Sequence, residues 1–324
     1  MIYNKPAISI DDQISLLQDR GLEFESIQIA KKYLAHISYY RLAGYWWPMY
    51  EDKVNHNFKP NSKFKDVVAL YNFDHKLRML LFDVIEKIEI SFRTKLIYHL
   101  SIELDPWWFA DSENFSDEAD HKKTLASIKR EINRSKDQFI RAHKEDYHED
   151  TRLPPAWKTL EVASLGSLSR LYGNLKGNIR SKKNIARELG AVNQTYLPSW
   201  LHSISQIRNI CAHHGRLWNK NLPTTVKLLP KPKRAWIKQV PEANEFKHLY
   251  VHMCVMKYLL NIIDPTNSFG AKLNCLMKEY QRNVDPNALG FKENWVKEEL
   301  WRTKKSSFEV FTKVKVALCD FWNK

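Results

Sequence analysis

The chain of 324 residues has little cysteine, little glycine and no long apolar run. Its four cysteines, at positions 211, 254, 275 and 319, stand far apart with no Cys-x-x-Cys pair, which argues against a disulfide framework and a cysteine zinc cluster. No stretch reaches about 18 apolar residues, and the first residues lack the apolar core of a signal peptide. We therefore expect a soluble cytoplasmic protein that does not attach to membranes.

Several motifs of catalysis and cofactor binding are also missing. The sequence contains no Gly-x-Gly-x-x-Gly, no Gly-x-x-x-x-Gly-Lys-Ser/Thr, no His-Glu-x-x-His and no Gly-x-Ser-x-Gly. His248 and His252 have the spacing of two metal ligands on one helix face, but no glutamate follows His248 and no third ligand is evident. We expect a solvated or partly buried histidine pair there, and neither a metal nor another cofactor.

Positive charge is what the chain has in excess. Lys and Arg total 51 against 37 Asp and Glu, so the formal net charge is +14. A surplus of this size favours a polyanionic partner, because each neutralised phosphate releases counterions. By charge alone, RNA, DNA and an anionic membrane surface all fit, and a basic protein without a polyanionic partner is the alternative.

The apolar pattern is helical over nearly the whole chain, which predicts an all-α fold. The longest pattern covers residues 64–100, where apolar side chains recur in steps of three and four without Gly or Pro. Loops are predicted at 50–62 and, rich in Lys and Pro, at 219–236, and no hairpin signal is evident. The other predicted helices cover 11–21, 27–37, 121–143, 156–175, 182–189, 198–211, 242–263 and 267–282, with a last apolar series at 308–321.

The most informative segment covers residues 199–219, SWLHSISQIRNICAHHGRLWN. On a helix, Ile204, Ile207 and Cys211 would form the buried stripe. Gly215 is the predicted C-cap, which would place His213 and His214 in the last turn. A protonated imidazole is favoured there, at the negative end of the helix dipole.

Arg208, Asn209 and His213 interrupt this apolar stripe with side chains suited to phosphate chemistry. A guanidinium binds two phosphate oxygens at once, and an imidazole exchanges protons near neutral pH. The Arg-x-x-x-x-His spacing alone is weak evidence, because a chain of this composition acquires it by chance. On these residues alone, a polar cluster that caps the helix end is an equally good interpretation.

The string RNICAHHGRLWN resembles the Arg-Asn-x-x-x-His signature of HEPN-domain ribonucleases, specifically the abortive-infection (Abi) family of bacterial phage-defence proteins. Four further segments are similar to that family, in the same order along the chain. They are KPAISIDDQISLLQDRGL, ISYYRLAGYWWPMY, IEKIEISFRTKL and GFKENWVKEELW, so the resemblance spans roughly residues 5–301.

The resemblance implies an all-α, HEPN-like helical bundle with N- and C-terminal helical extensions. In this chain the expected parts are an N-terminal helical segment at 1–62, the domain with the motif at 63–264 and a C-terminal extension at 265–324. The family also implies a homodimer and metal-independent RNA cleavage in phage defence or a toxin–antitoxin system. A regulatory small RNA or a partner protein is expected to restrain that activity.

The resemblance assigns catalysis to Arg208, Asn209 and His213, with His214 as a second candidate for the proton transfers. A two-histidine mechanism then needs a second copy of the motif, which a two-fold axis would supply. Supporting roles are expected for Glu89 and Arg93, although an i,i+4 ion pair is the simpler interpretation of that spacing. The expected RNA contacts are Arg41, Arg216, Lys220, Lys231, Lys233 and Arg234.

Three alternatives remain open at this point. A non-catalytic RNA-binding or scaffold module would use Arg208 and His213 only to hold phosphate. A DNA-binding regulator would prefer duplex DNA over single-stranded RNA. The basic loop could equally be a solvated one, and the aromatic run from Tyr39 to Trp47, which could stack on bases, is more typical of a core.

Overall fold

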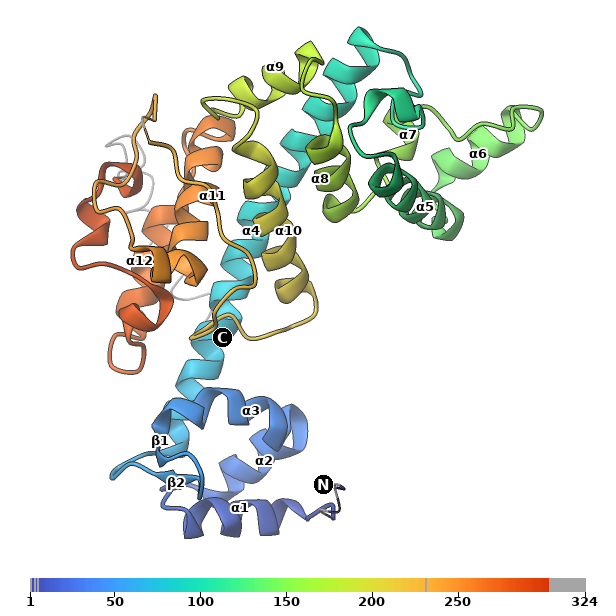
Figure 1. Ribbon diagram of the computed structural model, residues 1–324. Helices are drawn as coiled ribbons and strands as arrows, with labels where there is room; N and C mark the ends of the chain where they lie inside the picture. Colours follow the sequence, from blue (N-terminus) through green and yellow to red (C-terminus); the bar gives the residue numbers. More distant parts are fainter. Residues whose placement is uncertain (1, 3, 5, 231, 303–324) are drawn as a thin grey trace.

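The computed structural model describes residues 2, 4, 6–230 and 232–302, and it is all-α as predicted (Figure 1). The predicted apolar series at 308–321 lies outside the described residues. Described helices and strands are α1 (Ile10–Asp19), α2 (Ile27–Ile37), α3 (Tyr39–Trp46), β1 (Tyr50–Asp52), β2 (Asn57–Phe58), α4 (Phe64–Glu103), α5 (Glu118–Arg134), α6 (Gln138–Asp146), α7 (Ala156–Thr159), α8 (Leu165–Asn174), α9 (Arg180–Glu188), α10 (Leu197–Ala212), α11 (Leu249–Ile263) and α12 (Phe269–Glu279). None of the helices in these residues combines the length and hydropathy that crossing a membrane requires.

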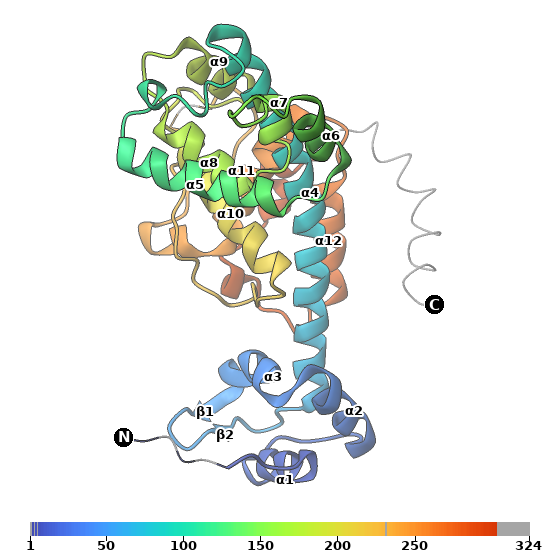
Figure 2. The same cartoon turned by 90° about the vertical axis from the view of Figure 1, so that its right-hand side faces the viewer.

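Helix α4 is the axis of the molecule, and it confirms the predicted helix at 64–100. Its 40 residues span about 60 Å. Buried side chains recur along it from Phe64 to Leu100. They pack against α3 near its start and against α7 to α12 farther along (Figures 1 and 2). The other helices are therefore arranged around one continuous helix.

Helices α1, α2 and α3 form a small N-terminal unit at the start of α4 (Figure 2). Helix α1 starts at a capping box between Ser9 and Asp12, and the chain turns at Gly21 with φ +92°, as a glycine readily does. The ring of Phe64 stacks on Phe24 at a centroid distance of 5.1 Å. These contacts fasten the N-terminal unit to the first turn of α4.

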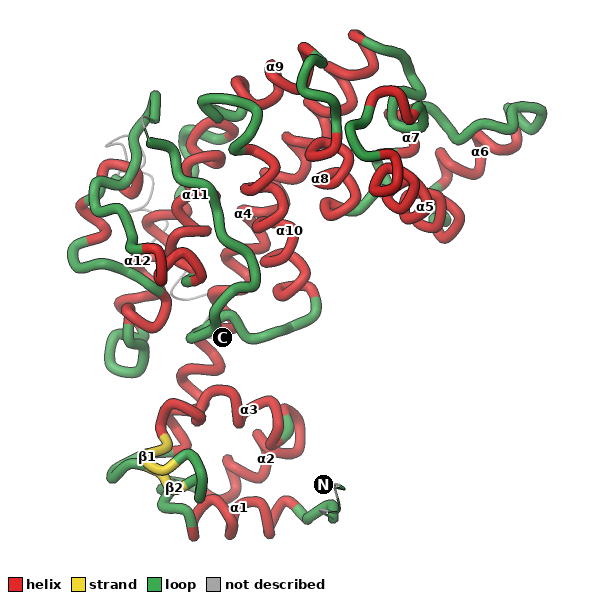
Figure 3. The backbone as a smooth tube through the Cα atoms, in the orientation of Figure 1, coloured by secondary structure: helices red, strands yellow, loops and turns green. Residues whose placement is uncertain are grey.

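The prediction of a plain loop at 50–62 is wrong, because β1 and β2 form an antiparallel hairpin there (Figure 3). Its turn has no Asn-Gly pair to reveal it. Instead the Asp52 carboxylate accepts hydrogen bonds from the backbone amides of Val54 and Asn55, at 2.8 and 3.1 Å. Side-chain turns of this kind leave only a faint trace in a sequence.

Two predicted helices are each divided in the structure. The predicted helix at 121–143 is α5 and α6, separated where the Ser135 hydroxyl donates to the Asp137 carboxylate at 2.6 Å. The predicted helix at 156–175 is the short α7 followed by α8, whose N-cap is Ser164. In the C-terminal part, the predicted helix at 242–263 starts as α-helix only at Leu249, after a 3-10 turn at Ala243–Lys247.

The loop prediction for 219–236 is confirmed, because no helix or strand occurs between α10 and the 3-10 turn at Ala243–Lys247 in the described residues (Figure 3). Helix α11 follows, and it is buried along most of its length between α4 and α10. Helix α12 then lies against α4, where Glu279 pairs with Lys76 at 2.6 Å.

His252 belongs to the core of α11, with 1% of its surface exposed. Its Nε2–H donates to the carbonyl of Phe246 at 3.1 Å, so Nδ1 accepts from the Ser203 hydroxyl of α10. Both ring nitrogens are therefore engaged inside the protein, and neither is free for a metal. Burial lowers the pKa of His252 to about 4.

We predict that His252 makes the protein sensitive to mild acid. The unfolded chain binds a proton here near pH 6.5, whereas the folded chain does so only near pH 4, so stability falls as the pH is lowered through that window. The expected loss is roughly 2 kcal/mol between pH 7.5 and pH 5, and it reaches about 3 kcal/mol at pH 4. Urea unfolding at pH 7.5 and pH 5 measures it, with His252→Gln as the variant that cannot titrate. An equal pH dependence in both proteins would contradict the prediction.

Candidate active site

The motif lies at the end of α10, whose buried stripe is the predicted one. Ile204, Ile207 and Cys211 are all buried. They face the packed neighbours α8, α4 and α11. Burial raises the pKa of the Cys211 thiol to about 12, so this cysteine is a core residue and not a nucleophile.

The predicted C-cap of α10, Gly215, is wrong by two residues. The last helical residue is Ala212, His213 is the C-cap, and His214 takes the left-handed conformation with φ +55°. The amide of His214 donates to Cys211 O at 3.1 Å and the amide of Gly215 to Ile210 O at 2.8 Å, which is a Schellman closure. The two histidines therefore lie just beyond the last turn.

Gly215 serves this closure through its small size. A Cβ atom at this position would lie 3.1 Å from the Ile210 side chain and 3.3 Å from its carbonyl oxygen. The residue with a positive φ at this helix end is His214, and not Gly215, the predicted C-cap. Both histidines are exposed, and His213 makes no side-chain hydrogen bond to any described residue.

Asp74 of α4 holds the residues that follow these histidines. Its fully buried carboxylate accepts from the amides of Leu217 and Trp218, at 3.1 and 2.7 Å, and from the Tyr45 hydroxyl at 2.7 Å. Arg78, one turn along α4, pairs with the same carboxylate and also donates to Gly215 O at 3.4 Å. Burial raises the pKa of Asp74, while these four donors oppose that shift.

Helix α3 contacts the same stretch from the other side. Arg41 donates from Nη1 to the carbonyl of His214 at 2.7 Å, and the guanidinium of Arg216 donates to the carbonyl of Gly44. A Cβ atom on Gly44 would be 3.4 Å from the Arg216 side chain, so a glycine suits this crossing. The Tyr-Tyr-Arg-Leu-Ala-Gly-Tyr and Arg-Asn-x-x-x-His segments thus meet, although about 170 residues separate them in the chain (Figure 1).

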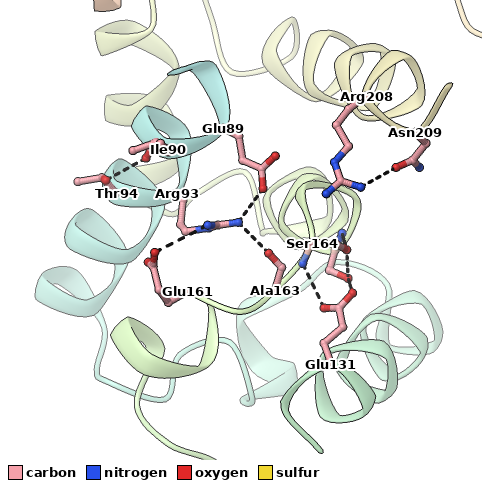
Figure 4. Close-up of polar contacts among 11 residues, drawn as sticks. Glu89, Ile90, Arg93, Thr94, Glu131, Glu161, Ala163, Ser164, Arg208 and Asn209 are labelled. Carbon is pink, nitrogen blue, oxygen red and sulfur yellow. Dashed lines mark hydrogen bonds and ion pairs between the residues drawn. The ribbon is translucent and has the colours of Figure 1, made fainter. Parts of the chain in front are cut away.

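Arg208 and Asn209 lie one turn before the histidines. The Nη1 of Arg208 donates to Asn209 Oδ1 at 3.4 Å. Figure 4 shows the Arg208 side chain extending from α10 toward the start of α8, where Ser164 and Glu131 lie. Arg208 forms no ion pair with a carboxylate of the described residues, so its charge remains available to a ligand.

Glu89 and Arg93 form the simple ion pair, at 2.7 Å, on the side of α4 near Arg208 (Figure 4). Arg93 also donates to the carbonyl of Ala163 at 2.9 Å and lies 3.8 Å from the Glu161 carboxylate. The Arg93 guanidinium therefore holds the connection between α7 and α8. No described contact joins Glu89 to the motif.

The expected RNA-contacting residues do not gather at one place. The loop after Trp218 runs back along α10, since the Trp200 indole donates to Lys227 O at 2.7 Å. Lys233 and Arg234 are exposed beyond that point, toward the other end of a helix about 24 Å long. Lys220 is half-buried just after Trp218, and Lys231 lies outside the described residues. Among the described members of this set, Arg41 and Arg216 alone contact the motif region.

In the aromatic run from Tyr39 to Trp47, the prediction of core residues is confirmed for two side chains. Tyr45 and Trp46 are buried, whereas Trp47 is about half exposed and Tyr40 is 89% exposed. Tyr40 directly precedes Arg41, so one exposed ring lies next to an exposed guanidinium. In the described residues, no group of three or more His, Cys, Asp or Glu side chains is placed to hold a metal ion.

Asp74 and Arg78 are not among the residues predicted from the sequence. A signal existed, because Asp74 and Arg78 continue the buried steps of α4 beside Phe73 and Leu77. Two opposite charges at i,i+4 on an apolar stripe indicate a buried pair with further partners. The partners themselves lie about 140 residues later and leave no local pattern.

We predict that Asp74→Ala destabilises the protein by about 3–5 kcal/mol, because the substitution leaves the Arg78 charge buried without its carboxylate and two amides buried without an acceptor. Urea unfolding measures the loss. Asp83→Ala, at an exposed position of the same helix, is the matched control, with an expected change within about 0.5 kcal/mol. A similar small change for both variants would contradict the assigned role of Asp74.

Comparison with known proteins identifies the family of the chain. The model of the Abi-like protein family matches residues 32–219, which include α3, α4 and the whole motif segment. Two of the segments with family resemblance, near residues 5–22 and 290–301, lie outside this match. Neither a curated protein nor a solved structure matches the chain. Because the family match covers more than half of the sequence, the chain belongs to the family of Abi-like proteins.

Proposed function

We propose that this protein is a metal-independent endoribonuclease of HEPN type that acts in abortive infection. Family membership points to phage defence as the setting. The observation that carries the proposed activity is the exposed end of α10. There His213 has no side-chain partner among the described residues, and the guanidinium groups of Arg208 and Arg41 are not neutralised by any described carboxylate.

The proposed reaction is transfer of a phosphodiester within the RNA. One imidazole takes the proton of the 2′-hydroxyl, and the 2′-oxygen attacks phosphorus. The bond from phosphorus to the 5′-oxygen breaks, and a second imidazole gives that oxygen a proton. The products are a 2′,3′-cyclic phosphate and a 5′-hydroxyl. Arg208 opposes the charge that builds up on the phosphate oxygens, and Asn209 orients its guanidinium.

The proposal includes a homodimer in which two motifs form one composite site. Exposed apolar side chains on α4 support it, because Met79 and Ile90 are each more than half exposed and Phe82 lies between them. These positions are three and eight residues apart, and eight residues are about two helical turns, so they share one face of α4. That face begins at Met79, five residues after Asp74. Pairing through α4 would bring two motifs close to one axis.

Unrestrained RNA cleavage would harm the host cell, so the proposal includes restraint. The charge of +14 favours RNA as the restraining partner, either a regulatory small RNA or the substrate's own structure. Lys233 and Arg234, about one α10 length away from the histidines, would serve such a partner better than the cleaved phosphodiester.

We predict that the protein cleaves labelled single-stranded RNA in EDTA and leaves 2′,3′-cyclic phosphate ends. Arg208→Ala and His213→Ala should each lower the single-turnover rate by about 100- to 10,000-fold, because each removes a group that acts in the transition state. His202→Ala, at an exposed position earlier on α10, is the control and should cleave normally.

The alternatives predict different results in the same assay. A binding or scaffold module would show no cleavage by any of these proteins, and His213→Ala would only weaken RNA binding. A DNA-binding regulator would prefer duplex DNA in a competition at constant salt concentration. Preparations are first freed of bound nucleic acid and checked for a co-purified inhibitor, since either would mask cleavage.

We predict that the double variant Met79→Glu, Ile90→Glu is a monomer that has lost cleavage activity, because charges on the α4 face oppose pairing of that face with its copy. Light scattering measures the mass. The control is Lys122→Gln with Lys123→Gln on α5, which changes the net charge by the same amount at exposed positions. A wild-type protein that cleaves as a monomer would contradict the dimer.

A further inference from the structure

Helix α9 presents a basic face to solvent that the proposed cleavage reaction does not use. The exposed side chains Arg180, Lys183 and Arg187 recur in steps of three and four, so they share one face of the helix. The other face, which includes Ile185 and Ala186, is buried, and α9 packs on α4. Three positive charges therefore line one side of a helix of only nine residues.

Within the described residues, no ion pair neutralises the charge of this face. The one acidic residue of α9, Glu188, pairs instead with Lys95 and His99 of α4, at 2.6 and 3.0 Å. Glu103, at the end of α4, accepts hydrogen bonds from the first two amides of α9 and so caps the helix. The three cations of the exposed face remain available to a ligand.

The stability of the helix alone does not favour this arrangement. Arg180 and Lys183 are separated by i,i+3, and Lys183 and Arg187 by i,i+4, and like charges at these spacings destabilise a helix. Arg180 also lies in the first turn, where a positive charge opposes the helix dipole. A ligand with several negative charges would offset both effects.

Part of the basic loop lies at the C-terminal end of α9. The ring of Trp236 packs edge-on against Tyr258 of α11, at a centroid distance of 5.3 Å. The Tyr258 hydroxyl donates at 3.0 Å to the carbonyl of Gly190, which follows α9. Lys233 and Arg234, just before Trp236, are exposed and add two positive charges near this end of the helix. The α9 basic surface comprises Arg180, Lys183, Arg187, Lys233 and Arg234.

The α9 basic surface is remote from the motif histidines. Arg78 contacts the carbonyl of Gly215 at the motif end of α10. Lys95, the partner of Glu188, lies 17 residues later on α4, which corresponds to about 25 Å. Figure 1 shows the same separation, with α9 near the end of α4 and the end of α10 closer to the N-terminal unit. A ligand on this surface is therefore held well away from the motif.

We infer that the α9 basic surface binds the phosphate backbone of RNA at a distance from the bond that is cleaved. The inference rests on the proposed function only for the choice of RNA over another polyanion. Guanidinium and ammonium groups bind phosphate oxygens without reading the bases, so the surface accepts RNA of many sequences. Such contacts increase the affinity for long RNA and leave the chemistry of cleavage unchanged.

The first test measures RNA binding alone. The parent protein carries His213→Ala, so that the RNA stays intact, and it binds a labelled single-stranded RNA of about 30 nucleotides, roughly 100 Å long when stacked. Adding Arg180→Gln, Lys183→Gln and Arg187→Gln should raise Kd by about 10- to 100-fold at low salt. The slope of log Kd against log salt concentration should fall by about 2, because three phosphate contacts are lost.

The matched control is the triple variant Lys122→Gln, Lys123→Gln and Lys129→Gln, which removes the same charge from exposed positions of α5. Glutamine has a helix propensity close to that of Arg and Lys, so the α9 variant should melt no lower than its parent. Unchanged RNA affinity in the α9 variant, or an equal loss in both triple variants, would overturn the inference. Loss of binding to phosphatidylserine vesicles with unchanged RNA binding would also overturn it.

A second test identifies which RNA the surface holds. If it holds a distant part of the substrate, the three α9 substitutions in the wild-type background raise KM for the long RNA and leave kcat unchanged. Cleavage of a trinucleotide is then unaffected, because at about 3.4 Å per nucleotide it is too short to reach α9 from the motif. If the surface holds a separate, restraining RNA, KM is unchanged and nucleic acid that co-purifies with the wild type is absent from the variant.

The failures of the two proposals are distinguishable. If the wild type cleaves no RNA and the α9 substitutions still abolish RNA binding, the nuclease is refuted and the α9 basic surface stands. If the wild type cleaves RNA and the α9 variant binds and cleaves it equally well, the surface is refuted and the nuclease stands.

Discussion

The buried carboxylate of Asp74 is the contact on which the candidate site depends. It accepts hydrogen bonds from a hydroxyl of α3, from a guanidinium of its own helix α4 and from two amides of the chain after α10. Burying a charge is costly, and this one is tolerated because it is surrounded by donors on several sides. Asp74 thereby joins α3, α4 and the chain after α10, which are far apart in the sequence. These contacts fix the position of the exposed histidines at the end of α10.

Much of the fold could be predicted because apolar periodicity is a local property. The length of α4, the buried stripe of α10 and the long loop after Trp218 all follow from it. Periodicity did not reveal the hairpin at 50–58, the break at Ser135 or the end of α10. These features are set by particular hydrogen bonds, such as those that the Asp52 carboxylate accepts from two amides. A pattern of apolar residues carries no information on them.

The residues of the candidate site also fall into two groups, those that a local sequence pattern identifies and those that only the folded structure identifies. Arg208, Asn209 and His213 occur within six residues, so one short motif identifies them. Asp74 and Arg78 lie on another helix, and only the three-dimensional structure relates them to the motif. Charge alone was a poor guide to position, because Lys233 and Arg234 of the basic loop lie toward the far end of α10. Arg41, by contrast, does lie at the motif, because its guanidinium donates to the backbone carbonyl of His214.

The left-handed conformation of His214 has a consequence for how this segment can vary. Most side chains pay about 1–2 kcal/mol in this conformation, whereas glycine adopts it freely. At position 214, a substitution can therefore remove the imidazole without changing the backbone conformation. A glycine there preserves the path of the chain and the carbonyl that Arg41 uses, while it deletes the ring. A valine or isoleucine there would disturb the path itself, so related sequences are expected to alternate between histidine, asparagine and glycine at this point.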